Sequence, residues 1–225
     1  MPRFHNDLLK LSPVWLLVAL LAFLLGLPLS AQTLYDNGPV NGHTDAWLIS
    51  LGYAVSDSFT ISGVGGSATI TGFSFYAWMY PGDTLASVEL SITSVPFGGM
   101  TYFQGVVSNF TASNCFSNQG GWNVCQDTAS FDGPELRNGA YWLTLQNATA
   151  QNGDVAFWDE NSGIGCQSPG CPSSATDNNY PGSIPGETFS VLGTVSGSGS
   201  VPEPNSLLLF TGGVFALALL RRKLC

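Results

Sequence analysis

Residues 68–95 read Ala-Thr-Ile-Thr-Gly-Phe-Ser-Phe-Tyr-Ala-Trp-Met-Tyr-Pro-Gly-Asp-Thr-Leu-Ala-Ser-Val-Glu-Leu-Ser-Ile-Thr-Ser-Val, and this stretch decides the fold. Two segments rich in β-branched and aromatic residues, 68–80 and 85–95, flank the turn formers Pro81, Gly82 and Asp83. Within the second segment, apolar and polar residues alternate, which places them on opposite faces of a strand. The apolar set is Val88, Leu90 and Ile92, and the polar set is Glu89, Ser91 and Thr93.

The same pattern recurs over the rest of the central chain. Further strand-like segments are separated by turn formers such as 96–99, 132–134 and 151–153, and no long stretch has helical periodicity. We therefore predict an all-β domain over residues 32–195, an antiparallel two-sheet sandwich of jelly-roll type. The other expected strands are 46–50, 56–62, 101–113, 140–148, 154–158 and 188–195.

The distribution of charge excludes two classes of protein. Between residues 32 and 204 there are fourteen acids and one base, Arg137, a net charge of −13. Nucleic acid is therefore not expected as a partner, because phosphate binding needs clustered Lys and Arg. The 12% aromatic content also excludes a disordered acidic tail, which would be poor in apolar residues.

The N-terminus has the layout of a secretory signal peptide. Arg3 and Lys10 precede an apolar run over residues 14–27, and the small residue Ala31 offers a cleavage point. We predict a signal peptide over residues 1–31 that signal peptidase removes. A retained membrane anchor is the alternative.

The C-terminus reverses this order. A Gly/Ser linker over 196–200 precedes an apolar run over 207–220. That run would form a helix about 21 Å long, shorter than a hydrocarbon core of roughly 30 Å. The basic residues after it should stay on the cytoplasmic side, so we predict a short transmembrane helix in a tail over 201–225. The stop consists of Arg221, Arg222 and Lys223.

This tail resembles the PEP-CTERM sorting signal in its order of motif, short helix and basic stop. The motif residues are Val201, Pro202, Glu203 and Pro204. The resemblance implies recognition by exosortase, a membrane cysteine transpeptidase of Gram-negative bacteria, with cleavage near the motif. It further implies delivery to the cell surface or to an exopolysaccharide matrix. The same tail occurs on ice-binding proteins, so it reports sorting and not activity.

The central domain also resembles secreted sandwich domains that accompany PEP-CTERM tails. The residues that carry this likeness lie in four short segments: 35–38 (Tyr-Asp-Asn-Gly), 81–84 (Pro-Gly-Asp-Thr), 139–143 (Gly-Ala-Tyr-Trp-Leu) and 157–159 (Phe-Trp-Asp). The likeness supports the fold and leaves the function open.

Four cysteines lie in the exported part, and an even count in an oxidising compartment favours disulfides. Three pairings are possible, and the sequential one closes the two shortest loops. A zinc site is disfavoured because the spacings do not give short paired knuckles. The expected disulfide residues are Cys115, Cys125, Cys166 and Cys171.

Candidate catalytic residues are few. His43 is the one histidine beyond the signal peptide, and no Gly-x-Ser-x-Gly motif is present, which argues against a Ser-His-Asp triad. Glycoside hydrolysis needs two carboxylates on one site. Asp159 and Glu160 are adjacent in a strand and point apart, whereas Glu89 with Asp159 is a possible pair across strands. We predict a non-enzymatic protein.

Calcium is a further use for the acids, because this cation binds several carboxylate and carbonyl oxygens. The segments 36–38 and 159–161, together with Asp154, offer such oxygens, but no Asp-x-Asp-x-Asp-Gly loop is present. We expect solvated acidic loops and no cofactor, with structural calcium as the alternative.

Aromatic residues give the most concrete binding hypothesis. Strand geometry places Phe73, Phe75 and Met79 on one face of the segment 72–80 and three other aromatic residues on the opposite face. Rows of rings beside polar side chains suit sugars, unless both faces are buried and the rings are core. The candidate sugar-binding residues are Tyr76, Trp78, Tyr80, Trp142 and Trp158, with Trp122 as a further one.

The sequence as a whole predicts an exported surface or extracellular-matrix protein, structural or carbohydrate-interacting, with exopolysaccharide as an expected partner. One alternative is a glycosidase-like or lyase-like sandwich enzyme. Another is an uncut membrane-tethered protein or an ice-binding protein, although the lone Thr-x-Thr at 69–71 belongs to no regular array.

Overall fold

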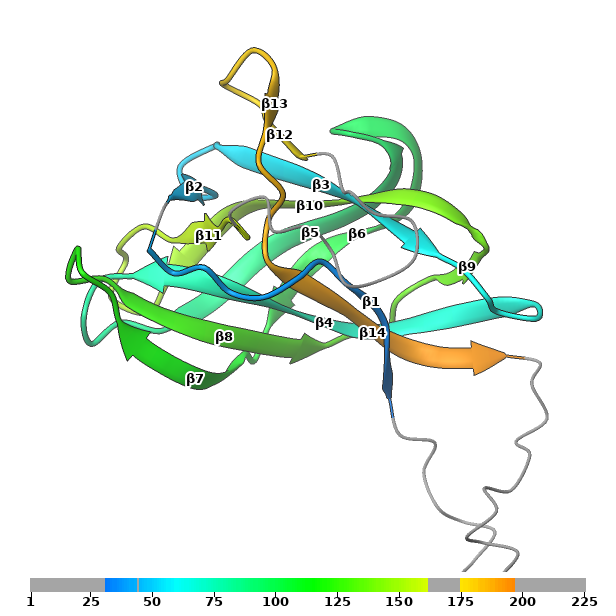
Figure 1. Ribbon diagram of the computed structural model, residues 1–225, viewed down its shortest axis with the longest axis horizontal. Coiled ribbons are helices and arrows are strands. Elements are labelled where there is room, and N and C mark those ends of the chain that lie inside the picture. The colour runs from blue at the N-terminus through cyan, green and yellow to red at the C-terminus, as the bar shows by residue number, and fades with distance from the viewer. Residues whose placement is uncertain (1–30, 44, 162–174, 197–225) are drawn as a thin grey trace, which may run out of the picture. The chain divides into compact units, whose positions relative to one another are not determined.

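The computed structural model describes residues 31–43, 45–161 and 175–196, and these form two antiparallel β-sheets (Figure 1). No helix occurs among these residues, so the prediction of an all-β sandwich is confirmed. Consequently, no helix able to cross a membrane is found in these ranges. The predicted signal peptide, linker and tail lie outside them, apart from the boundary residues Ala31 and Ser196.

The larger sheet, called sheet A here, is organised around β4 (Ser67–Met79). One edge of β4 pairs with β14 and then β11, and the other edge pairs with β9 and then β8. Strand β1 extends the sheet beyond β14, β2 extends it beyond β11, and β7 extends it beyond β8. Their bounds are β1 Gln32–Asp36, β2 Ala46–Leu48, β7 Thr111–Ser117, β8 Asn123–Ser130, β9 Glu135–Arg137, β11 Phe157–Asp159 and β14 Phe189–Ser196.

The smaller sheet, sheet B, has six strands in the order β13-β12-β3-β10-β5-β6. In the view of Figure 1, β3 and β10 lie above β4, β8 and β14. The bounds are β3 Ala54–Ile61, β5 Leu85–Val95, β6 Gly98–Ser108, β10 Gly139–Ala150, β12 Ala175–Asp177 and β13 Ser183–Ile184.

The core fills the space between the inner faces of the two sheets. On β5, Val88, Leu90 and Ile92 are at most 1% exposed, which confirms the alternation expected from the sequence. The polar set faces outward; Thr93 is nevertheless buried, and its hydroxyl donates to the Val95 carbonyl. The largest fully buried side chains include Trp158, Tyr35, Phe59, Phe73, Phe75 and Phe189.

One predicted strand is in fact two. The segment 101–113 has continuous strand propensity, yet β6 ends at Ser108 in sheet B and β7 begins at Thr111 in sheet A. Asn109 between them has a φ of 62°, a left-handed conformation that a strand cannot contain. Asparagine tolerates this conformation better than most residues, so the chain crosses between the sheets here.

A bulge in β4 sets the direction of its aromatic side chains. Ala68 and Ile70 point inward, and an unbroken strand would then turn every even-numbered residue inward. The register with β14 slips between Leu192 and Gly193, which inserts one extra β4 residue at Thr71. After the bulge the odd-numbered residues, from Phe73 onward, point inward instead.

Candidate functional site

The outer face of β4 carries the aromatic residues expected from the sequence. Phe73, Phe75 and Met79 are at most 1% exposed, so they belong to the core. Tyr76 and Trp78 are half-buried on the other face, and Tyr80, just beyond the strand, is 47% exposed. The two-faced interpretation of this strand is therefore confirmed.

Trp78 belongs to an apolar row that crosses sheet A on its outer face. Residues directly opposite each other on antiparallel strands share a face and pack together. Trp78 lies opposite Val124 of β8 on one side and Phe157 of β11 on the other. The row, which we call the outer row, consists of Phe116, Val124, Trp78, Phe157 and Leu48.

Two more rings meet Phe157 beside this row, and we call Tyr80, Trp122 and Phe157 the aromatic corner. The centroid of the Trp122 ring lies 4.6 Å from that of Tyr80 and 5.2 Å from that of Phe157. These distances are in the range of favourable aromatic contacts. Because Tyr80 is well exposed and Trp122 half-buried, the corner presents ring surface to solvent.

The turn before Trp122 is held by Asn118, which is 8% exposed. Its side-chain oxygen accepts hydrogen bonds from the backbone N–H groups of Gly120 and Trp122, each at 3.0 Å. The backbone of Asn118 also donates to the Trp122 carbonyl at 3.0 Å. These bonds hold the backbone of the turn that carries Trp122.

A polar groove lies next to the outer row, on the same face. Its volume is about 290 Å³, and the loop over residues 38–40 forms one wall. Ser74, Tyr76 and Gln126 line it from β4 and β8, and Asp36 and Ser190 line it from β1 and β14. Asn114 donates to the Gln126 side-chain oxygen at 2.8 Å and so orients that amide. The outer face thus changes from polar to aromatic along the strands.

The Asp159 carboxylate holds the loop at Asn41 and Gly42 against this face by hydrogen bonds. Its carboxylate accepts hydrogen bonds from Trp78 Nε1 (2.6 Å), from the N–H groups of Asn41 (3.0 Å) and Gly42 (2.9 Å), and from Thr188 Oγ1 (3.3 Å). Burial raises the pKa of Asp159, and these donors act against that rise. Since its oxygens are already in use and it is 0% exposed, Asp159 holds structure.

The enzymatic pair considered from the sequence does not form. Glu89 lies on the outer face of β5 in sheet B, whereas Asp159 is buried on β11 in sheet A. Glu89 accepts hydrogen bonds from Asn147 (2.9 Å) and Gln104 (3.0 Å), and these bonds lower its pKa. The structure therefore does not bring these two carboxylates together, and the pair that the sequence left open gains no support. His43 is exposed, as expected.

Two of the candidate sugar-binding tryptophans lie elsewhere. Trp158 is 0% exposed, packs against the rings of Phe75 and Phe189, and donates its indole N–H to the Thr188 carbonyl at 3.0 Å. Its predicted role at the surface was wrong, because cross-strand packing turns it into the core. Trp142 is half-buried on the outer face of sheet B, away from Tyr76 and Trp78.

A buried group of acids, which we call the acid junction, comprises Asp57, Glu160 and Glu187. The Glu187 N–H donates to Asp57 Oδ2 at 2.7 Å, and residues 160 and 187 form a β-bridge. Asn37 Nδ2 donates to the same Asp57 oxygen at 2.9 Å. Both carboxylate oxygens of Glu187 lack a hydrogen-bond partner, and its pKa is raised well above its usual value by burial and by Asp57 and Glu160.

The calcium hypothesis was placed on segments near this junction. Asn161 Nδ2 donates to the Asn37 carbonyl, so segments 36–38 and 159–161 do come together. Asp154 is exposed in the turn before β11. Over the ranges that the structure covers, no group of three or more His, Cys, Asp or Glu is arranged to hold a metal ion. The arrangement therefore singles out no metal centre there.

A disulfide joins the two strands at the end of the outer row. The sulfur atoms of Cys115 on β7 and Cys125 on β8 are 2.09 Å apart. The register between these strands slips between Ser113 and Phe116, so the bridge lies at an irregular point of the edge. The other predicted pair, Cys166 and Cys171, lies outside the described residues.

The tail decides where the protein is sorted. Residues 200–223 match the PEP-CTERM protein-sorting motif. The resemblance seen in the sequence is thereby confirmed, and the motif residues 201–204 and the basic stop 221–223 fall inside the match. No curated protein matches the chain.

A PEP-CTERM motif indicates export through membrane-associated sorting to the cell surface of a Gram-negative bacterium, with exosortase as the processing enzyme. The matched residues lie outside those that the structure describes, and they belong to the tail.

Proposed function

We propose that the sandwich is a non-enzymatic, carbohydrate-interacting component of the cell surface or extracellular matrix. The outer face of sheet A is the proposed contact surface, and the PEP-CTERM tail is the device that delivers it there. The jelly-roll type of the sandwich is part of the same proposal, since the chain passes repeatedly between the two antiparallel sheets.

The observation that carries this proposal is the aromatic corner beside a polar groove. A sugar ring has apolar C–H faces that pack on aromatic rings and hydroxyl edges that need hydrogen-bond partners. Tyr80 and Trp122 offer the ring surface, and Ser74, Gln126 and Ser190 offer hydroxyl and amide groups on the same face. Tyr80 directly follows β4 and Trp122 directly precedes β8, the strands that carry Ser74 and Gln126, so a chain of sugars can contact both kinds of group together.

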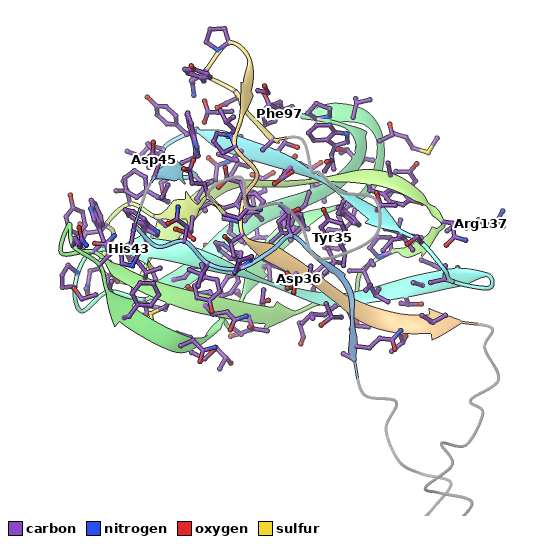
Figure 2. All side chains as sticks on the ribbon, in the orientation of Figure 1. Tyr35, Asp36, His43, Asp45, Phe97 and Arg137 are labelled. Carbon is purple, nitrogen blue, oxygen red and sulfur yellow. A yellow bond between two sulfur atoms is a disulfide. The ribbon has the colours of Figure 1, made fainter. Side chains whose placement is uncertain are left out.

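The charge of the domain narrows the class of carbohydrate. Between residues 32 and 204 the chain has fourteen acids and one base, Arg137, which Figure 2 shows at the opposite end of the domain from His43 and Asp45. A polyanionic polysaccharide would be repelled by such a surface. The proposed partner is therefore a neutral exopolysaccharide.

Affinity electrophoresis tests this proposal. The protein is run in native gels containing neutral polysaccharides such as β-glucan, xylan or mannan, and we expect retardation in at least one. Trp122→Ala should lose most of that retardation, because the packing of a sugar ring on the indole is removed without opening the core. Trp142→Ala, on the outer face of sheet B, is the matched control and should migrate like the wild type.

The proposal fails if no neutral polysaccharide retards the protein, or if Trp142→Ala and Trp122→Ala lose retardation equally. Thermal unfolding of both variants shows whether each still folds. A glycosidase-like or lyase-like sandwich is the alternative function, and release of reducing ends or unsaturated products from the same polysaccharides would favour it.

The fate of the tail is tested separately by intact-mass measurement on protein from the native host. We expect a mature C-terminus near Pro204, as cleavage by exosortase requires. A chain that still ends at Cys225 would instead indicate a membrane-tethered protein. Ice binding is disfavoured because Thr69 is half-buried and the Thr71 hydroxyl is buried.

A further inference from the structure

Strand β6 forms an open edge of sheet B. It pairs with β5 on one side, and among the described residues no strand pairs with its other side. Backbone N–H and C=O groups on an open edge can pair with a strand of another molecule, so natural proteins usually block such edges with charged residues, proline or bulges. The sequence of β6, Gly-Gly-Met-Thr-Tyr-Phe-Gln-Gly-Val-Val-Ser, contains neither a charged residue nor proline.

Bulges protect the first part of β6 and leave the second part regular. The register with β5 slips between Ile92 and Thr93 and again between Thr93 and Val95, so residues 98–102 follow an irregular path. From Phe103 to Ser108 the register is unbroken. Six regular residues span about 20 Å, which is the usual length of a strand. We call residues 103–108 the open edge.

The other strands at the margins of the two sheets offer less. Strands β2, β9 and β13 have at most three residues each. Strand β1 has a register slip between Thr33 and Tyr35, and β7 has one between Ser113 and Phe116, beside the disulfide. Within the part of the chain that the structure describes, the open edge is therefore the longest regular margin without a partner strand.

The chain around the open edge carries no charge. Residues 90–126 contain no Asp, Glu, Lys, Arg or His, whereas residues 32–204 as a whole have fourteen acids and one base. Two copies of so acidic a domain repel each other where their acids face. Across two paired β6 strands, the Glu89 carboxylates on the neighbouring β5 strands would be about 14 Å apart, which is more than the Debye length of about 8 Å. Two copies can therefore approach each other at this edge.

Exposed apolar side chains accompany the open edge. Val106 lies on the outer face of β6, opposite Glu89, and is 72% exposed. Met100 is 64% exposed, and Phe97, in the turn before β6, is 42% exposed. A single exposed apolar residue is common, but here three belong to one hairpin that also has an open backbone edge. Covering this hairpin removes apolar surface from water.

We propose that the domain pairs with a second copy of itself through the open edge, with the two β6 strands antiparallel about a two-fold axis. The pairing joins two B sheets into one, satisfies the open backbone groups and brings the two Val106 side chains near the axis on one face. A second copy fits because it carries the same uncharged edge, whereas a cationic partner would be drawn to the acidic faces. The pairing uses sheet B and the proposed sugar contacts use sheet A, so either can fail without the other.

Sedimentation velocity tests this pairing on the protein as the native host leaves it, from about 1 to 200 μM. A strand edge is a small interface, so the wild type should change from monomer to dimer as its concentration rises. Added salt should favour the dimer, because it screens the repulsion between two acidic domains. Val106→Glu should weaken dimerisation by roughly tenfold or more, because it places like charges near the axis. Val106→Thr stays β-branched and uncharged and should still dimerise.

Three further variants keep the result decisive. Leu51→Glu is the matched control, since it replaces another exposed apolar residue by an acid in the turn before β3, two strands away from β6, and it should dimerise like the wild type. Trp122→Ala should also dimerise, which separates the open edge from the aromatic corner. Ser108→Glu, exposed on the same edge, should weaken dimerisation and serves if Val106→Glu fails to fold, as thermal unfolding would show.

Several results would overturn the inference. These are a wild type that stays monomeric, an association that salt dissociates, and folded Val106→Glu and Ser108→Glu variants that dimerise like the wild type. Loss of the dimer in Trp122→Ala alone would place the contact at the aromatic corner. Open-ended oligomers, or a different protein that sediments with the wild type and is released by Val106→Glu, would show that β6 pairs with another edge. Any association through the tail is common to all variants and leaves these comparisons intact.

Discussion

Asp127→Asn should make the stability of the protein less dependent on pH. The Asp127 carboxyl is 1% exposed, and its pKa is raised by burial from 3.8 to about 7. Each pKa unit corresponds to about 1.4 kcal/mol of difference between the two protonation states. The shift of about three units therefore corresponds to about 4 kcal/mol that the ionised side chain subtracts from stability above pH 7.

The sign follows from proton binding. Between pH 3.8 and about 7 the folded protein keeps a proton on Asp127 that the unfolded chain releases. The folded state then binds more protons, so the free energy of unfolding falls as the pH rises through this window. Below pH 3.8 both states are protonated and the penalty is absent. An asparagine cannot ionise and removes this contribution at every pH.

Urea denaturation followed by tryptophan fluorescence, repeated from pH 4 to pH 8, measures the effect. The free energy of unfolding of Asp127→Asn relative to the wild type should rise across this range by about 4 kcal/mol. The difference between proteins is the relevant quantity, since Glu160 and Glu187 are present in both. Asp132→Asn, an exposed acid just after β8, is the matched control and should run parallel to the wild type. If Asp127→Asn also runs parallel to the wild type, Asp127 ionises normally and the reasoning is refuted.

Three further predictions follow from the packing. Glu187→Gln should raise the melting temperature at pH 7, because it removes a fully buried carboxyl group with a raised pKa. Added calcium should change the melting temperature of neither protein. A rise with calcium in the wild type that the variant lacks would instead indicate a cation site. Trp158→Ala should lower the free energy of unfolding, measured by urea denaturation, by about 3–5 kcal/mol because it empties a core position. An equal loss in Trp122→Ala would contradict the placement of Trp158 in the core and of Trp122 at the surface. Gly42→Ala should destabilise the protein more than Gly63→Ala. Both glycines have a positive φ, but an added methyl group collides with an aromatic ring, that of Phe116, only at Gly42. Equal melting temperatures of the two variants would mean that the loop around Gly42 moves away freely.

Local pattern was enough to predict several elements of the fold. The segment 85–95 was expected as a strand with Val88, Leu90 and Ile92 inward, and β5 has those bounds and those buried residues. The alternation works because a strand turns successive side chains to opposite faces wherever it lies in the sheet. The same rule separated Phe75 from Tyr76 correctly.

Other elements escaped prediction because their signal is not local. Strand β8 has few β-branched residues, and it is held in sheet A by pairing with β4 and β7. The split of segment 101–113 depends on a single left-handed residue, Asn109, within a run of good strand formers. In the sequence, Trp158 looks like a surface aromatic residue beside polar neighbours. It belongs to the core because it packs against Phe75 and Phe189 from other strands.

In the candidate site, too, residues close in the sequence could be predicted and residues brought together by strand pairing could not. Tyr76, Trp78 and Tyr80 could be predicted because they follow one another at alternate positions of one strand. Trp122 and Phe157 come from segments 35 residues apart, and only strand pairing brings them to the aromatic corner. Asp127 was not singled out, since nothing in its neighbourhood in the sequence shows that its carboxyl lacks a partner.

By itself, the sequence determined that this is an exported all-β chain with a PEP-CTERM sorting tail, because signals, strand alternation and charge distribution are contiguous features that can be read in order. The tertiary structure alone decided which side chains share a surface. The bulge at Thr71 turns Tyr76 and Trp78 outward, and the pairing of β8 with β4 and β7 encloses Asp127. Those outcomes depend on contacts between segments far apart in the chain, and their register is set by the packing of the whole sheet.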